Sequence, residues 1–142
     1  MYKEGYCLGF DFGLKKIGYA IGQFITHTAQ PQGIIHVKDG QVDWDAIRKI
    51  IKEWRPVCLI VGLPKAIDDS PLYITEHVLQ FAKELEQFHL PVHLSDERMT
   101  TKEAKSHLFE KGGFKALAYG KVDSVAAAIL LEQWMNEPKA SF

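Results

Sequence analysis

The apolar positions of the first forty residues follow the two-residue period of β-strands. Apolar runs at 6–12 and 17–23 are separated by the turn-like segment Gly13-Leu14-Lys15-Lys16, which predicts a β-hairpin. A third extended stretch, at 33–37, ends at Asp39-Gly40, a dipeptide typical of tight turns. Three strands in succession predict an antiparallel meander.

Beyond residue 42 the apolar period changes to that of helices. Asp43 is a typical N-cap, and apolar residues then recur at three- and four-residue steps as far as Pro56. Thr100 and Glu103 have the spacing of a capping box. The predicted helices cover about 43–55, 74–88, 100–110 and 123–135, and short apolar strands lie at 57–61 and 91–94.

The resulting order is β-β-β-α-β-α-β-α-α. It predicts an α/β fold with a mixed five-stranded sheet, in which an antiparallel meander adjoins parallel strands, flanked by helices. With 142 residues and a mass of 16.1 kDa, the chain has room for one domain. We expect that domain to cover 1–137 and a frayed tail to follow at 138–142.

Charge and hydropathy restrict the possible partners. The formal net charge of -1 gives no overall attraction for a polyanion, so a nucleic-acid site must be a local patch. One such patch, alternatively a solvated helix face, lies between residues 98 and 121. It places six cations against two glutamates: Arg98, Lys102, Lys105, Lys111, Lys115 and Lys121 against Glu103 and Glu110. Without an apolar run of about 18 residues or signal-peptide features, we expect a cytoplasmic protein and no membrane partner.

Asp11 is the most informative residue. A carboxylate inside the apolar run Leu8–Gly13 is costly unless its charge is offset. Strand alternation places Cys7 and Gly9 on its face, so either a ligand or a closely packed helix can approach. We favour a metal ligand over a carboxylate that pairs with a lysine or caps a turn.

Three further acidic residues occur at predicted element ends. Asp96 and Glu97 belong to the segment Ser95–Arg98 that directly follows the strand 91–94, where open sheets place their sites, although acids ahead of a helix also favour its dipole. Asp123 begins a small-residue helix and is alternatively its N-cap. Clustered carboxylates bind Mg²⁺ or Mn²⁺, which activates water for phosphodiester hydrolysis.

Cysteine and histidine give no comparable signal. Cys7 and Cys58 lie inside apolar runs, so we expect buried free thiols without chemistry. The six histidines are scattered without a paired metal spacing, and we interpret them as surface or half-buried residues.

Several ordered motifs are spread over almost the whole chain. They are Leu8–Gly13 with Lys16–Ala20, Ile60–Pro64, Ser95–Thr101 and Val122–Ala127. Together they resemble the YqgF family. The resemblance implies an RNase H-like fold. It also implies one of two functions described for that family, Holliday-junction resolution or maturation of the 5′ end of precursor 16S ribosomal RNA.

The resemblance also implies site residues. Asp11, Glu97 and Asp123 would be the catalytic and metal-binding acids, with Asp96 their uncertain neighbour, and Mg²⁺ or Mn²⁺ the cofactor. We expect phosphate contacts from Lys16, Arg98, Thr100, Thr101, Lys102, Lys111, Lys115 and Lys121. Lys16 stands where the family commonly has arginine, and 65–70 departs from the family's loop, so phosphate binding and substrate choice are where this chain differs.

The leading hypothesis is therefore a metal-dependent endonuclease for precursor rRNA, acting as a monomer on the small-subunit precursor. A resolvase of branched DNA would need a dimer with two symmetric sites. A non-catalytic RNase H-like binding module is the alternative from another class. Asp11-Phe12-Gly13 beside a hairpin also suggests an actin- or sugar-kinase-like phosphotransferase, which normally needs two such lobes.

Overall fold

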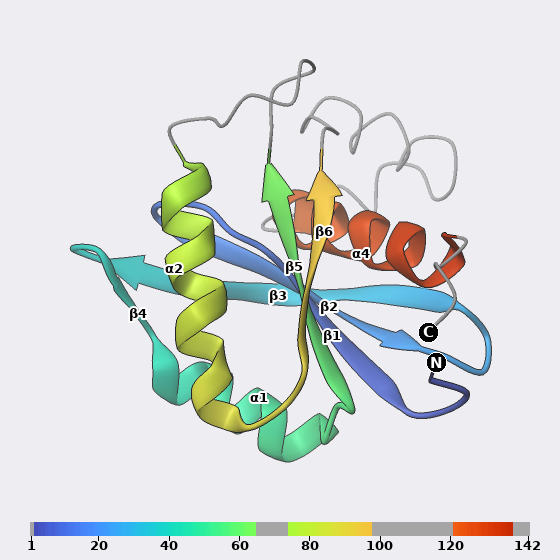
Figure 1. The fold of residues 1–142 in the computed structure, drawn as a ribbon. Coiled ribbons are helices and arrows are strands. Elements are labelled where there is room, and N and C mark those ends of the chain that lie inside the picture. The colour runs from blue at the N-terminus through green and yellow to red at the C-terminus, as the bar shows by residue number, and fades with distance from the viewer. Residues whose placement is uncertain (1, 65–73, 98–120, 138–142) are drawn as a thin grey trace.

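The computed structural model describes residues 2–64, 74–97 and 121–137 (Figure 1). Its strands form a single six-stranded sheet in the order β4-β3-β2-β1-β5-β6. The strands are β1 (Tyr6–Asp11), β2 (Lys16–Gln23), β3 (Thr28–Lys38), β4 (Gln41–Val42), β5 (Cys58–Pro64) and β6 (Val92–Glu97). The helices are α1 (Trp44–Trp54), α2 (Thr75–Leu85), the 3-10 turn η1 (Glu86–Phe88) and α4 (Lys121–Asn136).

The sheet is mixed, as predicted. β1, β2 and β3 form the antiparallel meander, whereas β1 pairs with β5 and β5 with β6 in parallel. The predicted strand count of five is wrong, because β4 folds back onto the end of β3 after the Asp39-Gly40 turn. Two residues are too few to show alternation, and Asp43 follows them immediately, so the pattern gave no sign of a strand.

β3 is also longer than the predicted stretch 33–37. It contains Pro31, which lies opposite Ala20 where the pairing register shifts between Tyr19 and Ala20. A proline cannot donate a ladder hydrogen bond, and a bulge is one of the few places where a strand tolerates it. The proline therefore marks an irregularity within the strand and not its boundary.

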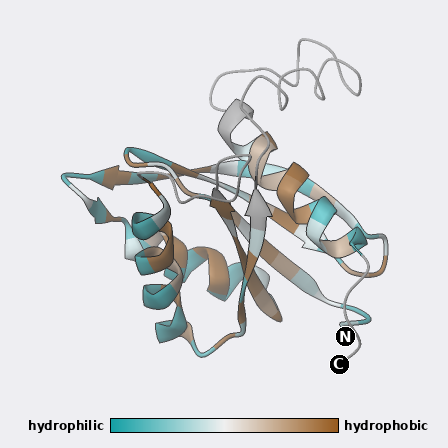
Figure 2. Cartoon of the chain, turned by 45° about the horizontal axis from the view of Figure 1, so that its top comes forward, coloured by the Kyte–Doolittle hydropathy of each residue, from teal (hydrophilic) through white to brown (hydrophobic). Residues whose placement is uncertain are grey.

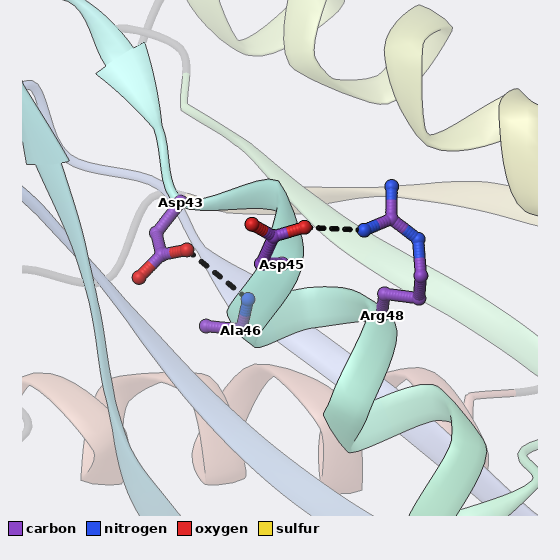
Figure 3. Close-up of polar contacts among 4 residues, drawn as sticks. All are labelled: Asp43, Asp45, Ala46 and Arg48. Carbon is purple, nitrogen blue, oxygen red and sulfur yellow. Dashed lines mark hydrogen bonds and ion pairs between the residues drawn. The ribbon is translucent and has the colours of Figure 1, made fainter.

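The helix ends follow local chemistry. The Asp43 side chain accepts a hydrogen bond from the Ala46 amide at 3.1 Å, which confirms the predicted N-cap, and Asp45 pairs with Arg48 one turn on (Figure 3). Arg55 adopts a left-handed conformation and ends α1. The predicted helix 74–88 is α2 followed by η1. The predicted helix 100–110 and tail 138–142 lie outside the described residues.

Two apolar cores lie on opposite faces of the sheet. α1 and α2 cover one face, where Leu8, Phe10 and Phe81 are buried, and their outer surfaces are hydrophilic (Figure 2). α4 covers the other face, where it buries Cys7 and Leu131. The predicted alternation in β1 is therefore confirmed, since Cys7 lies on the opposite face from Leu8 and Phe10. No helix in the described ranges is long and apolar enough to cross a membrane.

Candidate active site at the carboxyl edge of the sheet

Asp11 is the last residue of the central strand β1, and its side chain is half-buried. It pairs with Gly18 of β2, and on the other side Gly62 of β5 lies one residue beyond the Phe10–Val61 pair. Neither glycine contributes a side chain beside the carboxylate. Because β1 is held by a ladder on each side, Asp11 has a rigid backbone and uncrowded flanks.

α4 lies directly on the small-residue face of the meander. A Cβ atom at Gly9 would lie 3.2 Å from three Leu131 atoms, and one at Gly22 would lie 2.9 Å from the Met135 Cε. The alternative of a closely packed helix on this face is therefore confirmed at Gly9 and Gly22. The glycines allow the helix to approach the sheet, and a larger residue there would force it away.

The direction in which α4 crosses the sheet shows where its first turn lies relative to Asp11. Its buried stripe continues from Ala127 to Leu131 and Met135 in steps of four. Four helical residues rise about 6 Å and two strand residues about 6.6 Å, so the stripe moves back along β1 from Asp11 towards Cys7. Position 123 lies one turn before Ala127, at the edge of the sheet where β1 ends.

The far end of α4 is fixed at the opposite edge of the sheet. A Glu132 carboxylate oxygen accepts from the Ala29 amide at 3.0 Å, and the Asn136 amide donates to the His27 carbonyl at 3.3 Å. Both partners belong to the start of β3 and the turn before it. The helix is thus held at its carboxyl end by polar contacts and along its length by packing.

Strand register separates positions 96 and 97. Ser95 pairs with Gly62, Asp96 with Leu63 and Glu97 with Pro64. The His93 ring contacts Trp134 of α4 at a centroid distance of 5.0 Å, so odd-numbered positions of β6 belong to the α4 face. By alternation, position 97 shares that face with Asp11, and position 96 belongs to the face covered by α2.

Three sequence-distant acidic positions therefore belong to one edge and one face of the sheet: 11 at the end of β1, 97 at the end of β6 and 123 in the first turn of α4. Of the four candidate acids, only Asp11 has a side chain that the structure describes. Among all described side chains, no cluster of three metal-ligating groups is found. Carboxylates are the ligands preferred by hard cations such as Mg²⁺, so this donor set fits such an ion.

Of the predicted phosphate contacts, Lys16 is best placed. It is exposed, begins β2, and lies two residues before Gly18, so it is a diagonal neighbour of Asp11 on the same face. Gly13 shapes this hairpin, because a Cβ there would lie 2.5 Å from the Lys16 carbonyl oxygen. Lys121 is the first residue of α4. The remaining contacts, Arg98, Thr100, Thr101, Lys102, Lys111 and Lys115, lie outside the described residues, as does the divergent loop 65–70.

Two buried serines near the candidate acids were missed from the sequence. Ser95 is 5% exposed, two residues before Glu97, and Ser124 is fully buried, next to Asp123. Each adjoins an acidic position in a motif already noted, which is the signal that was available. Ser95 is at an odd-numbered position of β6, on the α4 face, and Ser124 belongs to the first turn of α4.

The thiols and the five described histidines conform to the predictions, whereas His107 lies outside the described residues. Cys7 and Cys58 are buried and free, and burial raises the pKa of each to about 12. His93 is half-buried, with the Tyr2 hydroxyl 3.1 Å from its Nε2. Cys7, Cys58 and His93 all lie in the first half of their strands, so neither the thiols nor His93 lies near the edge where Asp11 is found.

The model of one protein family, described as Holliday junction resolvase, matches residues 5–137. The chain belongs to the RuvX family. This is the family that the YqgF resemblance indicates, so that prediction is confirmed. The match covers all described elements and both motifs that contain the acids on β6 and α4.

Curated relatives of this RuvX chain span nearly its full length. A Legionella pneumophila (strain Lens) protein named "Putative pre-16S rRNA nuclease" is 52% identical over 135 residues, covering 94% of this chain and 97% of the relative. A Haemophilus influenzae (strain PittGG) protein of the same name is 50% identical over 130 residues, covering 91% and 94%.

Solved structures confirm the RNase H-like fold class. RuvC of Thermus thermophilus gives a TM-score of 0.54 at 12% identity, with 92% of this chain and 93% of that chain covered. The Fowlpox virus resolvase in complex with Holliday junction DNA gives 0.55 at 16% identity, covering 92% and 96%. At these identities the likeness is one of fold.

Proposed function

We propose that this RuvX chain is a divalent-metal-dependent endonuclease that hydrolyses phosphodiester bonds at the 5′ end of precursor 16S rRNA. Its catalytic and metal-binding acids are Asp11, Glu97 and Asp123. The observation that carries the proposal is their common edge and face, reached from β1, β6 and α4. The names of the relatives support precursor rRNA as substrate. Such a nuclease acts in the cytoplasm, on the small-subunit precursor.

Asp11, Glu97 and Asp123 would hold a Mg²⁺ or Mn²⁺ ion, which when bound would supply an activated water and offset the charge that develops on the phosphodiester. Asp11 holds its carboxylate at a fixed place, because its strand is hydrogen-bonded on both sides. Glu97 and Asp123 complete the donor set, and Asp96 is outside it because its position belongs to the opposite face. Lys16 binds a substrate phosphate as a point charge beside Asp11.

The remaining proposed phosphate contacts lie between the end of β6 and the first residue of α4 in the sequence. They are Arg98, Thr100, Thr101, Lys102, Lys111, Lys115 and Lys121. Because such contacts carry no base-specific information, selectivity rests on the shape of the RNA or its single-stranded character.

The test compares the wild type with Asp11→Asn, Glu97→Gln and Asp96→Asn for Mn²⁺-dependent cleavage of a precursor 16S rRNA leader. We expect Asp11→Asn and Glu97→Gln to abolish cleavage and Asp96→Asn to retain it. Asp45→Asn is the matched control, because this carboxylate is exposed on α1 and lies on the opposite face. Retained cleavage by Asp11→Asn would refute the catalytic assignment.

Metal binding has a readout that does not depend on cleavage. An ion that binds only the folded state increases the free energy of unfolding, by about 2.7 kcal/mol when its concentration is one hundred times its dissociation constant. The unfolding temperature rises accordingly. Mn²⁺ should therefore stabilise the wild type and Asp45→Asn, but not Asp11→Asn. Equal stabilisation of all three would place the ion elsewhere.

Holliday-junction resolution is the second candidate, favoured by the description of the family model. It requires two sites on one junction and hence a dimer. A four-way DNA junction is assayed beside the RNA, with the molecular mass of the complex measured by light scattering. Cleavage of the junction alone by a protein dimer would replace rRNA with branched DNA as the substrate. Binding of either nucleic acid without cleavage would indicate a binding module.

A further inference from the structure

A row of basic side chains continues from the candidate site across the meander. Lys16 pairs with His36 of β3, and Lys38 follows His36 by two residues on the same strand. We call Lys16, His36 and Lys38 the basic strip. All three are exposed.

Register places the basic strip on the face of Asp11. Ile17 and Ile35 pair with each other and are buried in the core under α1 and α2. Their neighbours Lys16 and His36 therefore belong to the opposite face, together with Gly18 and Asp11. Two strand residues span about 6.6 Å, so Lys38 lies one such step beyond the Lys16–His36 row.

The backbone fixes this arrangement. The Val37 amide donates to the Lys15 carbonyl at 2.9 Å, which joins the β1–β2 hairpin to the end of β3. The Asp43 amide donates to the His36 carbonyl at 3.2 Å, which holds the next segment beside it. The basic strip is thus part of the rigid sheet, and α4 lies over the other end of β3, at Ala29 (Figure 1).

Charges of both signs lie around the basic strip. Lys15 adds a further exposed cation at the hairpin. Asp39 is exposed in the following turn with a φ of 51°, while the Asp43 carboxylate is engaged as the cap of α1. A row of cations can neutralise several successive phosphates of a nucleic-acid strand, whereas a small anion would contact only one or two of them.

We propose that the basic strip holds the single-stranded RNA backbone on one side of the cleaved bond, so that this part of the substrate leaves the site across the ends of β2 and β3. This inference rests on the proposed function, because the position of Asp11 sets where the strand begins. It adds His36 and Lys38 to the substrate surface, with His36 as a hydrogen-bond donor and Lys38 as a charge.

The experiment measures binding of a fluorescein-labelled single-stranded leader RNA in EDTA, so that no cleavage occurs. We compare His36→Gln/Lys38→Gln with Lys49→Gln/Lys52→Gln, whose lysines are exposed on α1 at the opposite face. The strip variant should bind about threefold to tenfold more weakly, and its salt dependence should fall by about 0.7 for the lost Lys38 contact. The α1 variant should bind as the wild type does.

Asp39→Asn should change the RNA affinity in the opposite direction. Asparagine tolerates the left-handed conformation at this position, so the variant should fold and bind the RNA more tightly by removing the negative charge beside Lys38. In the cleavage assay with Mn²⁺, the strip variant should raise KM with kcat retained.

The outcomes separate the two proposals. A wild type that neither binds nor cleaves RNA overturns the proposed function and the basic strip with it. A wild type that cleaves RNA, with equal binding by the strip and α1 variants, overturns the basic strip alone. A weaker strip variant with an unchanged melting temperature supports the assignment.

Discussion

Replacement of Gly9 by alanine should destabilise this chain only while Leu131 is present. The new Cβ would lie 3.2 Å from the Leu131 Cβ, Cδ1 and Cδ2 atoms, closer than ordinary contact. Overpacking of this kind costs about 1–3 kcal/mol, and the reduced freedom of the unfolded chain returns about 0.4–1 kcal/mol. We therefore expect Gly9→Ala to lower the free energy of unfolding by roughly 1–2 kcal/mol.

Leu131→Ala removes two of the three close atoms. Alone it should cost about 2–5 kcal/mol, because Leu131 is fully buried and its loss leaves a cavity. In the double variant the alanine at position 9 occupies part of that space. The two effects should therefore couple by at least about 0.5 kcal/mol, with the double variant more stable than their sum predicts.

The assay is urea unfolding of the four proteins, followed by tryptophan fluorescence and circular dichroism. Gly33→Ala provides the matched control, because its Cβ would meet Tyr19 at an ordinary 3.5 Å, and Tyr19 packs in the core on the opposite face from Leu131. Gly33→Ala and Leu131→Ala should be additive. Additivity of Gly9→Ala and Leu131→Ala within about 0.5 kcal/mol would show that α4 does not rest on β1, and the placement of Asp123 would then be refuted.

Two further predictions concern the N-cap of α1 and the buried thiols. Asp43→Ala should lower the free energy of unfolding by about 1 kcal/mol through loss of the N-cap. Asp45→Ala should change it by less than about 0.5 kcal/mol, because Asp45 forms only an exposed ion pair. Equal changes for the two variants in urea unfolding would contradict this. Cys7 and Cys58, with pKa values of about 12, should not react with a thiol reagent at pH 8 until the chain unfolds. The folded state keeps thiol protons that the unfolded state loses, so stability should fall between about pH 8.5 and 12, and fall less in Cys7→Ala/Cys58→Ala; prompt native reactivity would refute the burial.

Local chemistry was readable from the sequence. The cap at Asp43 needs only its own side chain and the next turn of backbone, and the alternation in β1 follows from its position between two covered faces. These features depend on residues that are neighbours in the chain. For the same reason Asp11 stood out, as a carboxylate among apolar residues whose burial has a cost.

Features set by distant partners were not readable. β4 exists because the end of β3 offers a free edge, and the extent of β3 through Pro31 depends on a bulge opposite Ala20. The end of α2 at Leu85 is likewise followed by a 3-10 turn that the apolar spacing does not distinguish. The approach of α4 to Gly9 and Gly22 required the helix and the strands to be placed together.

The two acidic residues of β6 show how much a single register decides. Asp96 and Glu97 are equally acidic and adjacent, so composition and spacing treat them alike. Their strand has one face towards α2 and one towards α4, and the pairing of Ser95 with Gly62 fixes which position belongs to which. A slip of one residue would exchange them, because the side-chain period of a strand is two. The choice of Glu97 as a partner of Asp11 therefore depends on the β5–β6 register, and the contrast between Glu97→Gln and Asp96→Asn tests that register as well as the chemistry.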